Sequence, residues 1–100
     1  MKTIEVIFVR VYIMESSHLL SKILEHLRQE VKIRGVSVFR AIKGYGEEHA
    51  HTSSFLDLSL DLPLAVEFFD IPEKVDTALE HLYSFIKPEH IVFWHAKTNV

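Results

Sequence analysis

The densest cluster of polar side chains in the sequence is Glu47-Glu48-His49-Ala50-His51. In an extended segment, residues two apart point to the same side, so His49 and His51 can present two imidazoles to one metal ion. Glu47 or Glu48 can add a carboxylate oxygen, and this ligand set suits a divalent transition metal. His49, His51 and Glu48 are therefore candidate metal ligands. The alternative is a solvated polar loop whose histidines are hydrogen-bonded.

A second candidate site is the turn Gly44-Tyr45-Gly46, which is expected to follow a strand directly. Backbone N–H groups in a glycine-containing turn can hold an anion, and Lys43 would add a positive charge. The turn is not a P-loop, because the GxxxxGK[ST] pattern is absent. The alternative is a plain turn that ends the strand, in which glycine permits a positive φ.

Three basic side chains in the expected strands can also meet an anion. Arg40 can bind phosphate or carboxylate through its planar guanidinium. We expect it instead to pair with Glu67 or another acid across strands, because an unpaired arginine on a sheet face is costly. His95 and Lys97 share one face of the last strand, where they either approach an anion or are solvated edge residues.

No catalytic arrangement emerges from the sequence. The chain has no cysteine, which excludes disulfides, thiolate metal sites and a cysteine nucleophile. Its serines and histidines show no nucleophile-elbow pattern. Val38-Phe39-Arg40 superficially resembles the strand-and-arginine element of acylphosphatases, but it follows the first expected helix instead of preceding it. We therefore predict a protein that is not an enzyme.

The hydrophobic pattern predicts the elements that position these side chains. The first segment is rich in β-branched and aromatic residues, as strands are, and a leucine-rich stripe at helical spacing follows it. Ser16 and Ser17 are plausible caps of that helix, which should end before Gly35. Asp70 and Glu73 predict a capping box for a second helix, which Pro88 ends. We expect strands at 3–14, 36–43, 64–69 and 91–97.

The element order βαββαβ predicts an α+β ferredoxin-like sandwich, with a four-stranded antiparallel sheet and two helices on one face. The first strand is apolar on both faces, although the helices cover only one. A second apolar face on a domain of this size indicates a partner surface. We therefore expect a homo-oligomer in which bare sheet faces pack together. The alternative is that residues 47–62 fold over the sheet.

Composition limits the class of protein. The chain has 100 residues, 48% hydrophobic and 25% charged, which predicts a single globular domain over residues 1–100. The net charge of −3 does not favour nucleic acid as a partner. No apolar run approaches the roughly 20 residues of a membrane span, and no signal peptide is evident at the start. We expect a cytoplasmic protein that is not inserted in a membrane.

The segment 35–46, GVSVFRAIKGYG, followed by His51-Thr52, resembles the second strand and loop base of PII signalling proteins. The runs VRVYI at 9–13 and LSLDLP at 58–63 are more similar still to a PII-like family called domain of unknown function 190. Together the similar segments extend over essentially the whole chain. The resemblance implies a ferredoxin-like fold and a homotrimer.

The resemblance also implies a ligand site. In PII proteins, nucleotides bind in clefts between neighbouring subunits, and the loop after the Gly-[Phe/Tyr]-Gly turn is the effector loop. Transferred to this chain, residues 35–37 would flank an adenine, and residues 43–46 would lie near the phosphates or the loop base. Residues 47–57 would be the effector loop. The candidate ligand-binding residues are Gly35, Val36, Ser37, Arg40, Lys43, Gly44, Tyr45, Gly46, His95 and Lys97.

Two departures from the PII pattern limit this transfer. PII proteins carry a Gly-Asp-Gly-Lys loop where this chain has Phe69-Asp70-Ile71-Pro72-Glu73, and they carry paired C-terminal arginines where His95 and Lys97 are the nearest substitutes. ATP and 2-oxoglutarate sensing is therefore not implied. The resemblance favours a regulatory trimer that binds a small ligand, such as an adenine nucleotide or an anion. It would present residues 47–62 to a transporter or an enzyme. The alternative is a metal-binding protein that uses the histidine loop.

Overall fold

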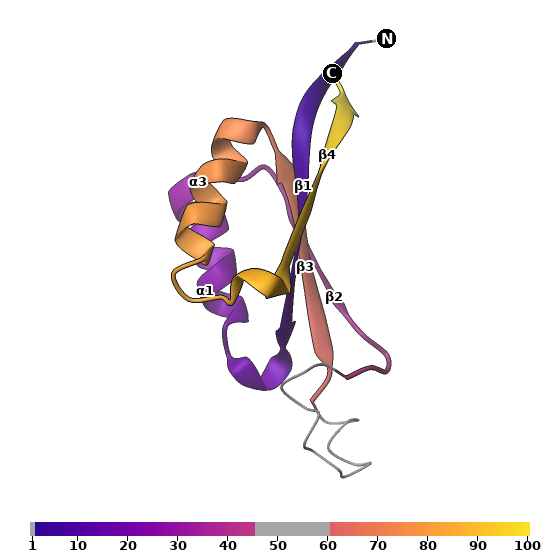
Figure 1. Cartoon of the computed structure of the whole chain (residues 1–100), viewed down its shortest axis with the longest axis vertical. Helices are drawn as coiled ribbons and strands as arrows, with labels where there is room; N and C mark the ends of the chain where they lie inside the picture. The colour runs from indigo at the N-terminus through magenta and orange to yellow at the C-terminus, as the bar shows by residue number, and fades with distance from the viewer. Residues whose placement is uncertain (1, 46–60) are drawn as a thin grey trace.

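The computed structural model describes residues 2–45 and 61–100. Within these ranges, a four-stranded sheet carries its helices on one side (Figure 1). The strands lie in the order β2-β3-β1-β4, and each neighbouring pair is antiparallel. The elements in chain order are β1 (Thr3–Met14), η1 (Glu15–Ser17), α1 (Leu20–Glu25), η2 (His26–Val31), β2 (Val36–Arg40), β3 (Pro63–Asp70), α3 (Pro72–Leu82), η4 (Pro88–His90) and β4 (Ile91–Asn99). The predicted ferredoxin-like sandwich is confirmed.

Strand β1 is a central strand, which explains why both of its faces are apolar. It pairs with β3 on one side and with β4 on the other. Its side chains therefore alternate between the helix-covered face and the bare face of the sheet. Val9 and Val11 point to the helices and are fully buried, whereas Tyr12 on the opposite face is 42% exposed.

The hydrophobic core lies between the sheet and the helices. Alternate residues of β1 and β3 meet the apolar faces of α1, η2 and α3, as the helical spacing predicted. The largest fully buried side chains of this core are Phe68, Ile23, Leu27, Leu82, Val9, Val11, Val66 and Val75. This layer fixes the sheet against the helices and leaves the opposite sheet face for other contacts.

The first helix differs from the prediction at its start, while it ends before Gly35 as predicted. Leu19 is its N-cap, and no side chain caps it. The predicted serine cap is wrong because Ser17 belongs to the 3-10 turn η1, where its hydroxyl donates to the carbonyl of Met14 over 2.7 Å. After Glu25 the helix widens into the π-helical turn η2, which ends at Lys32 with a positive φ of 62°.

The predicted capping box of the second helix is also wrong. Asp70 is the last residue of β3, and Ile71 is the N-cap of α3. The buried Asp70 carboxylate accepts hydrogen bonds from the backbone N–H groups of Ile71, at 2.8 Å, and of Arg34, at 3.2 Å. It thus ties the start of α3 to the segment that enters β2.

Strand β2 is shorter than expected, because it ends at Arg40 instead of residue 43. One further backbone hydrogen bond, from Ala41 N–H to the Pro63 carbonyl at 2.9 Å, follows the strand. Among residues 2–45 and 61–100, no helix is both long enough and apolar enough to cross a membrane.

Candidate functional site

The bare face of the sheet carries a layer of stacked aromatic rings. Phe8 of β1 stacks on Trp94 of β4, with ring centroids 4.7 Å apart, and on Phe69 of β3, with centroids 5.9 Å apart. The pairing register produces this layer, because Phe8 lies opposite both partners on adjacent strands. The three rings give the bare face a continuous apolar surface.

A charged pair sits within this aromatic layer. The Arg10 guanidinium donates to Glu67 over 2.5 Å and to the Tyr12 hydroxyl over 3.4 Å. Its carbon lies 5.6 Å from the centroid of the Trp94 ring, a cation–π distance. The hydrogen bonds to Tyr12 and Glu67 raise the pKa of Arg10 above its ordinary value, so the guanidinium stays charged.

Arg40 pairs with an acid, as expected, but the acid is Glu15 and not Glu67. In the register of β2 and β3, Arg40 lies opposite Leu64, while Ser37 lies opposite Glu67. Paired residues project to the same face, and Leu64 points into the core under the helices. Arg40 therefore projects to the helix side of the sheet, away from Glu67, and it donates to Glu15 over 2.9 Å.

Several large apolar side chains of the bare face are exposed. They are Tyr12 at 42%, Phe39 at 55%, Phe69 at 36%, Val92 at 46% and Trp94 at 40%. These residues come from all four strands and share one face by register. Exposed apolar side chains gathered on one face in this way indicate an interaction site.

An open groove of about 580 Å³ lies at one end of this face, where the chain enters β2. Its volume falls within the roughly 300–1,000 Å³ of small-molecule sites. The lining combines aromatic rings with polar groups: Phe8, Arg34, Gly35, Val36, Ser37, Phe39, Glu67, Phe68, Phe69 and Thr98. The groove therefore offers flat apolar surfaces beside a cation, a carboxylate and hydroxyl groups.

The charged wall of the groove is held by two contacts. The Arg34 guanidinium lies over the Phe69 ring, with its carbon 6.0 Å from the ring centroid. The backbone N–H of Arg34 donates to buried Asp70 over 3.2 Å. The backbone is thus fixed, whereas the exposed side chain can turn toward a ligand.

Within a single chain, the predicted ligand-binding residues lie in three separate places. Gly35, Val36 and Ser37 line the groove. Arg40, Lys43, Gly44 and Tyr45 lie at or beyond the other end of β2. His95 and Lys97 belong to the edge strand β4, which β3 and β1 separate from β2. A single chain therefore does not bring the three groups together.

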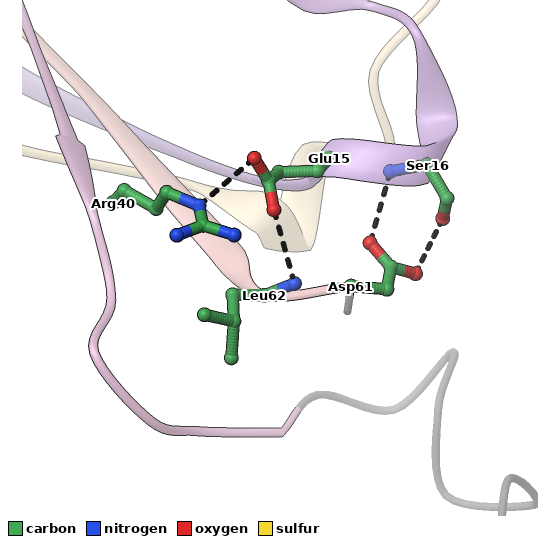
Figure 2. A network of polar contacts seen from close by, with 5 residues as sticks. All are labelled: Glu15, Ser16, Arg40, Asp61 and Leu62. Carbon is green, nitrogen blue, oxygen red and sulfur yellow. Dashed lines mark hydrogen bonds and ion pairs between the residues drawn. The ribbon is translucent and has the colours of Figure 1, made fainter. Parts of the chain in front are cut away.

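A network of polar contacts joins η1 to the end of β2 and to the residues that precede β3 (Figure 2). Glu15 accepts hydrogen bonds from Arg40 at 2.9 Å and from the backbone N–H of Leu62 at 3.4 Å. Asp61 accepts from Ser16, from its N–H at 2.9 Å and from its hydroxyl at 2.5 Å. The Arg40 hydrogen bond is the main reason that the pKa of Glu15 falls below its ordinary value.

The remaining candidates, Gly46, Glu48, His49 and His51, lie outside the described residues. Most of segment 47–62, the expected effector loop, lies outside them as well. Conversely, sequence reasoning missed Arg34, Phe39 and Phe69 as groove residues. Strand alternation could have found two of them. It places Phe39 on the same face as Ser37 and Phe69 on the same face as Glu67, and the register brings these four residues together.

Known proteins are similar to this chain over most of its length. The family model DUF190 (Uncharacterized ACR) matches residues 6–98. The UPF0166 protein MJ1524 of Methanocaldococcus jannaschii is 28% identical over 87 residues, which are 83% of this chain and 81% of that protein.

Solved structures of the protein CPII from Thiomonas intermedia K12 share the fold. CPII bound to ADP, AMP and acetate aligns with a TM-score of 0.67 and 14% identity, over 100% of this chain and 92% of that chain. Its complex with ADP and bicarbonate aligns with a TM-score of 0.63 and 14% identity, over 99% and 91%. The apo form, described as a nitrogen regulatory PII-like protein, aligns with a TM-score of 0.60 and 12% identity, over 99% and 95%. This likeness shows a PII-like fold.

Proposed function

Because the chain belongs to the DUF190 family and has a PII-like fold, we propose that it is a regulatory protein that binds a small ligand in the groove. The observation that carries this proposal is the groove itself, which residues 35–37 line together with Arg34 and Phe39. The same three residues are those that the PII resemblance places beside an adenine. The role is binding, without catalysis.

The chemistry of the groove favours an adenine nucleotide or a related anion. Phe39 and Phe69 present ring surface on which a flat heteroaromatic base can stack. Arg34 lies at the same groove and can pair with a phosphate through its planar fork. Glu67 and Ser37 add an acceptor and a hydroxyl for the edge of the base or for the sugar. CPII, which shares this fold, is described in complex with ADP and AMP.

The bare face supports assembly into a homotrimer. Its exposed rings, Tyr12, Phe39 and Trp94, give each chain apolar surface that a second copy can cover. The groove is open toward this same face, so a neighbouring subunit would close it. In that arrangement the ligand lies between subunits, and basic residues that one chain keeps apart can reach it from two chains.

Strand β2 offers a route from the groove to the effector loop. Val36 and Ser37 line the groove at its start, and Arg40 at its end holds Glu15 beside Leu62. A ligand that shifts β2 would therefore act on the base of residues 47–62, which we propose as the surface for a transporter or an enzyme partner. Such a shift requires that the ligand bind the two loop states with different affinity.

Calorimetric titration with AMP, ADP and ATP tests the ligand site. Arg34→Gln should weaken nucleotide binding about 10- to 100-fold, as the loss of one charge-assisted hydrogen bond predicts. Arg28→Gln is the matched control, because Arg28 is exposed on η2 and does not line the groove. Equal weakening by both variants would show only a nonspecific charge effect and would contradict the site.

A second pair of variants tests the shape of the groove. A Cβ atom added at Gly35 meets no heavy atom within 4 Å, so Gly35→Ala should fold and bind normally. Gly35→Phe places a large side chain at the same position, where it fills space in the groove, and it should abolish ligand binding. Unaltered binding by Gly35→Phe would exclude the groove as the ligand site.

A further inference from the structure

A pair of histidines lies on the helix side of the sheet, away from the groove. His26 of η2 and His81 of α3 stack with ring centroids 3.8 Å apart and an interplanar angle of 21°. Glu30, one turn after His26, has its Oε1 atom 2.9 Å from His26 Nδ1. One ligand atom from each of the three residues lies within 4.8 Å of the other two.

The buried histidine has an unused polar atom. The side chain of His26 is only 5% exposed, and its Nε2 atom has no hydrogen-bond partner among the described residues. When Nδ1–H donates to Glu30, Nε2 keeps a free lone pair in a nonpolar environment. Nε2 points away from Glu30, so an ion shared with Glu30 takes the place of the Nδ1 proton, and the ring then carries its proton on Nε2.

The local backbone brings these groups together. His26 is the first residue of the π-helical turn, and such turns occur frequently at functional sites. Helix α3 packs against this turn and brings His81 alongside from a distant part of the sequence. The site thus joins two helices that are separate in sequence, and a bound ion would cross-link them.

We propose that His26, Glu30 and His81 bind a divalent transition-metal ion, with Zn²⁺ as the best fit. Two imidazole nitrogens and one carboxylate oxygen are a common zinc ligand set, and solvent would complete the coordination because the Glu30 side chain is 61% exposed. Ligand atoms around a tetrahedral zinc lie roughly 3.3 Å apart, given bonds of about 2.0–2.1 Å. The half-buried His81 must therefore swing out of the stack toward Glu30 on binding.

The distances at the site agree with this assignment. His26 Nδ1 and Glu30 Oε1 already lie 2.9 Å apart, near the spacing of two ligand atoms on one ion. The nearby Lys22 ammonium is held 4.3 Å from the centroid of the Phe85 ring. The site lies on the other face of the sheet from the groove, so it does not depend on the proposed nucleotide site.

Titration of the tag-free protein with Zn²⁺ and Co²⁺ after chelator treatment tests the proposal. We expect one ion per chain, and we expect Glu30→Gln and His81→Gln each to weaken binding at least tenfold. Both side chains are partly exposed, so both variants should fold, which their metal-free thermal unfolding checks. Visible absorption of the Co²⁺ form should show bands of a four-coordinate site that disappear in His81→Gln.

Two control variants make the test specific. Glu80→Gln removes an exposed carboxylate next to His81 and should leave the affinity unchanged. The double variant His49→Gln/His51→Gln removes the other candidate ligands and should also bind normally. The proposal is overturned if Zn²⁺ does not bind with a dissociation constant below about 100 μM. It is also overturned if both site variants bind like the unaltered protein, or if only the double variant loses the ion.

Discussion

Val92 offers the clearest test of the proposed trimer. It lies on β4 opposite Arg10, on the bare face of the sheet, and it is 46% exposed. We predict that Val92→Lys prevents assembly while leaving each chain folded. The added ammonium can stay in water in a monomer, but a packed face would bury it next to the Arg10 guanidinium.

The size of the effect follows from the exposed fraction. Full burial of a valine side chain is worth about 2 kcal/mol, so covering the exposed 46% contributes about 1 kcal/mol per chain. Three chains lose about 3 kcal/mol per trimer, which weakens assembly roughly 100-fold. Burial of three ammonium groups adds several kcal/mol for each ion, so 100-fold is the minimum expected.

Sedimentation equilibrium measures the assembly directly. Val92→Ile is the matched control, because it keeps an apolar side chain at the same place and should remain a trimer. Circular dichroism checks that Val92→Lys retains the helices and sheet. A Val92→Lys protein that assembles as tightly as Val92→Ile would refute a trimer built on the bare face.

Three further predictions concern the core, the groove and the loop base. Leu82→Ala should destabilise the fold by about 2–5 kcal/mol in chemical denaturation, because Leu82 is fully buried; a change below 1 kcal/mol would contradict the core assignment. Asp70→Ala should cost about 1–3 kcal/mol and weaken nucleotide binding through Arg34, whereas Asp70→Asn should cost less, since its one carbonyl oxygen can still accept one of the two hydrogen bonds. The folded pKa of Glu15 lies below its ordinary value of 4.5, so its pairing with Arg40 stabilises the fold above that pH and is lost as the pH falls through the folded pKa. Glu15→Gln should therefore flatten the acid limb of a stability–pH curve, and an unchanged limb would exclude this pair as a contributor.

The central features of the fold could be predicted from the hydrophobic pattern. The bounds of β1 agree with the prediction, and its two apolar faces predicted the exposed apolar side chains on the sheet face away from the helices. Local signals were less reliable where tertiary contacts compete for the same side chain. Asp70 looks like a helix cap in sequence, but it accepts a hydrogen bond from Arg34, 36 positions away.

The site was harder to predict because it depends on register and helix packing. A shift of three residues between β2 and β3 decides whether Arg40 or Ser37 faces Glu67, and the sequence alone does not determine it. The pairing of His26 with His81 likewise depends on how two helices pack. Residues 35–37 were recognised only through the family resemblance, and their role in binding stays a prediction.

Hydrogen exchange with and without saturating ADP tests the central claim most directly, because it reports on the groove and on the effector loop in one measurement. We predict slower exchange in residues 34–39, which form the groove and β2, together with an altered exchange rate in residues 47–62. Protection of the groove alone would contradict the proposed relay to the loop. Unchanged exchange in both segments, at ADP concentrations that give full occupancy in calorimetry, would contradict the proposed ligand site itself.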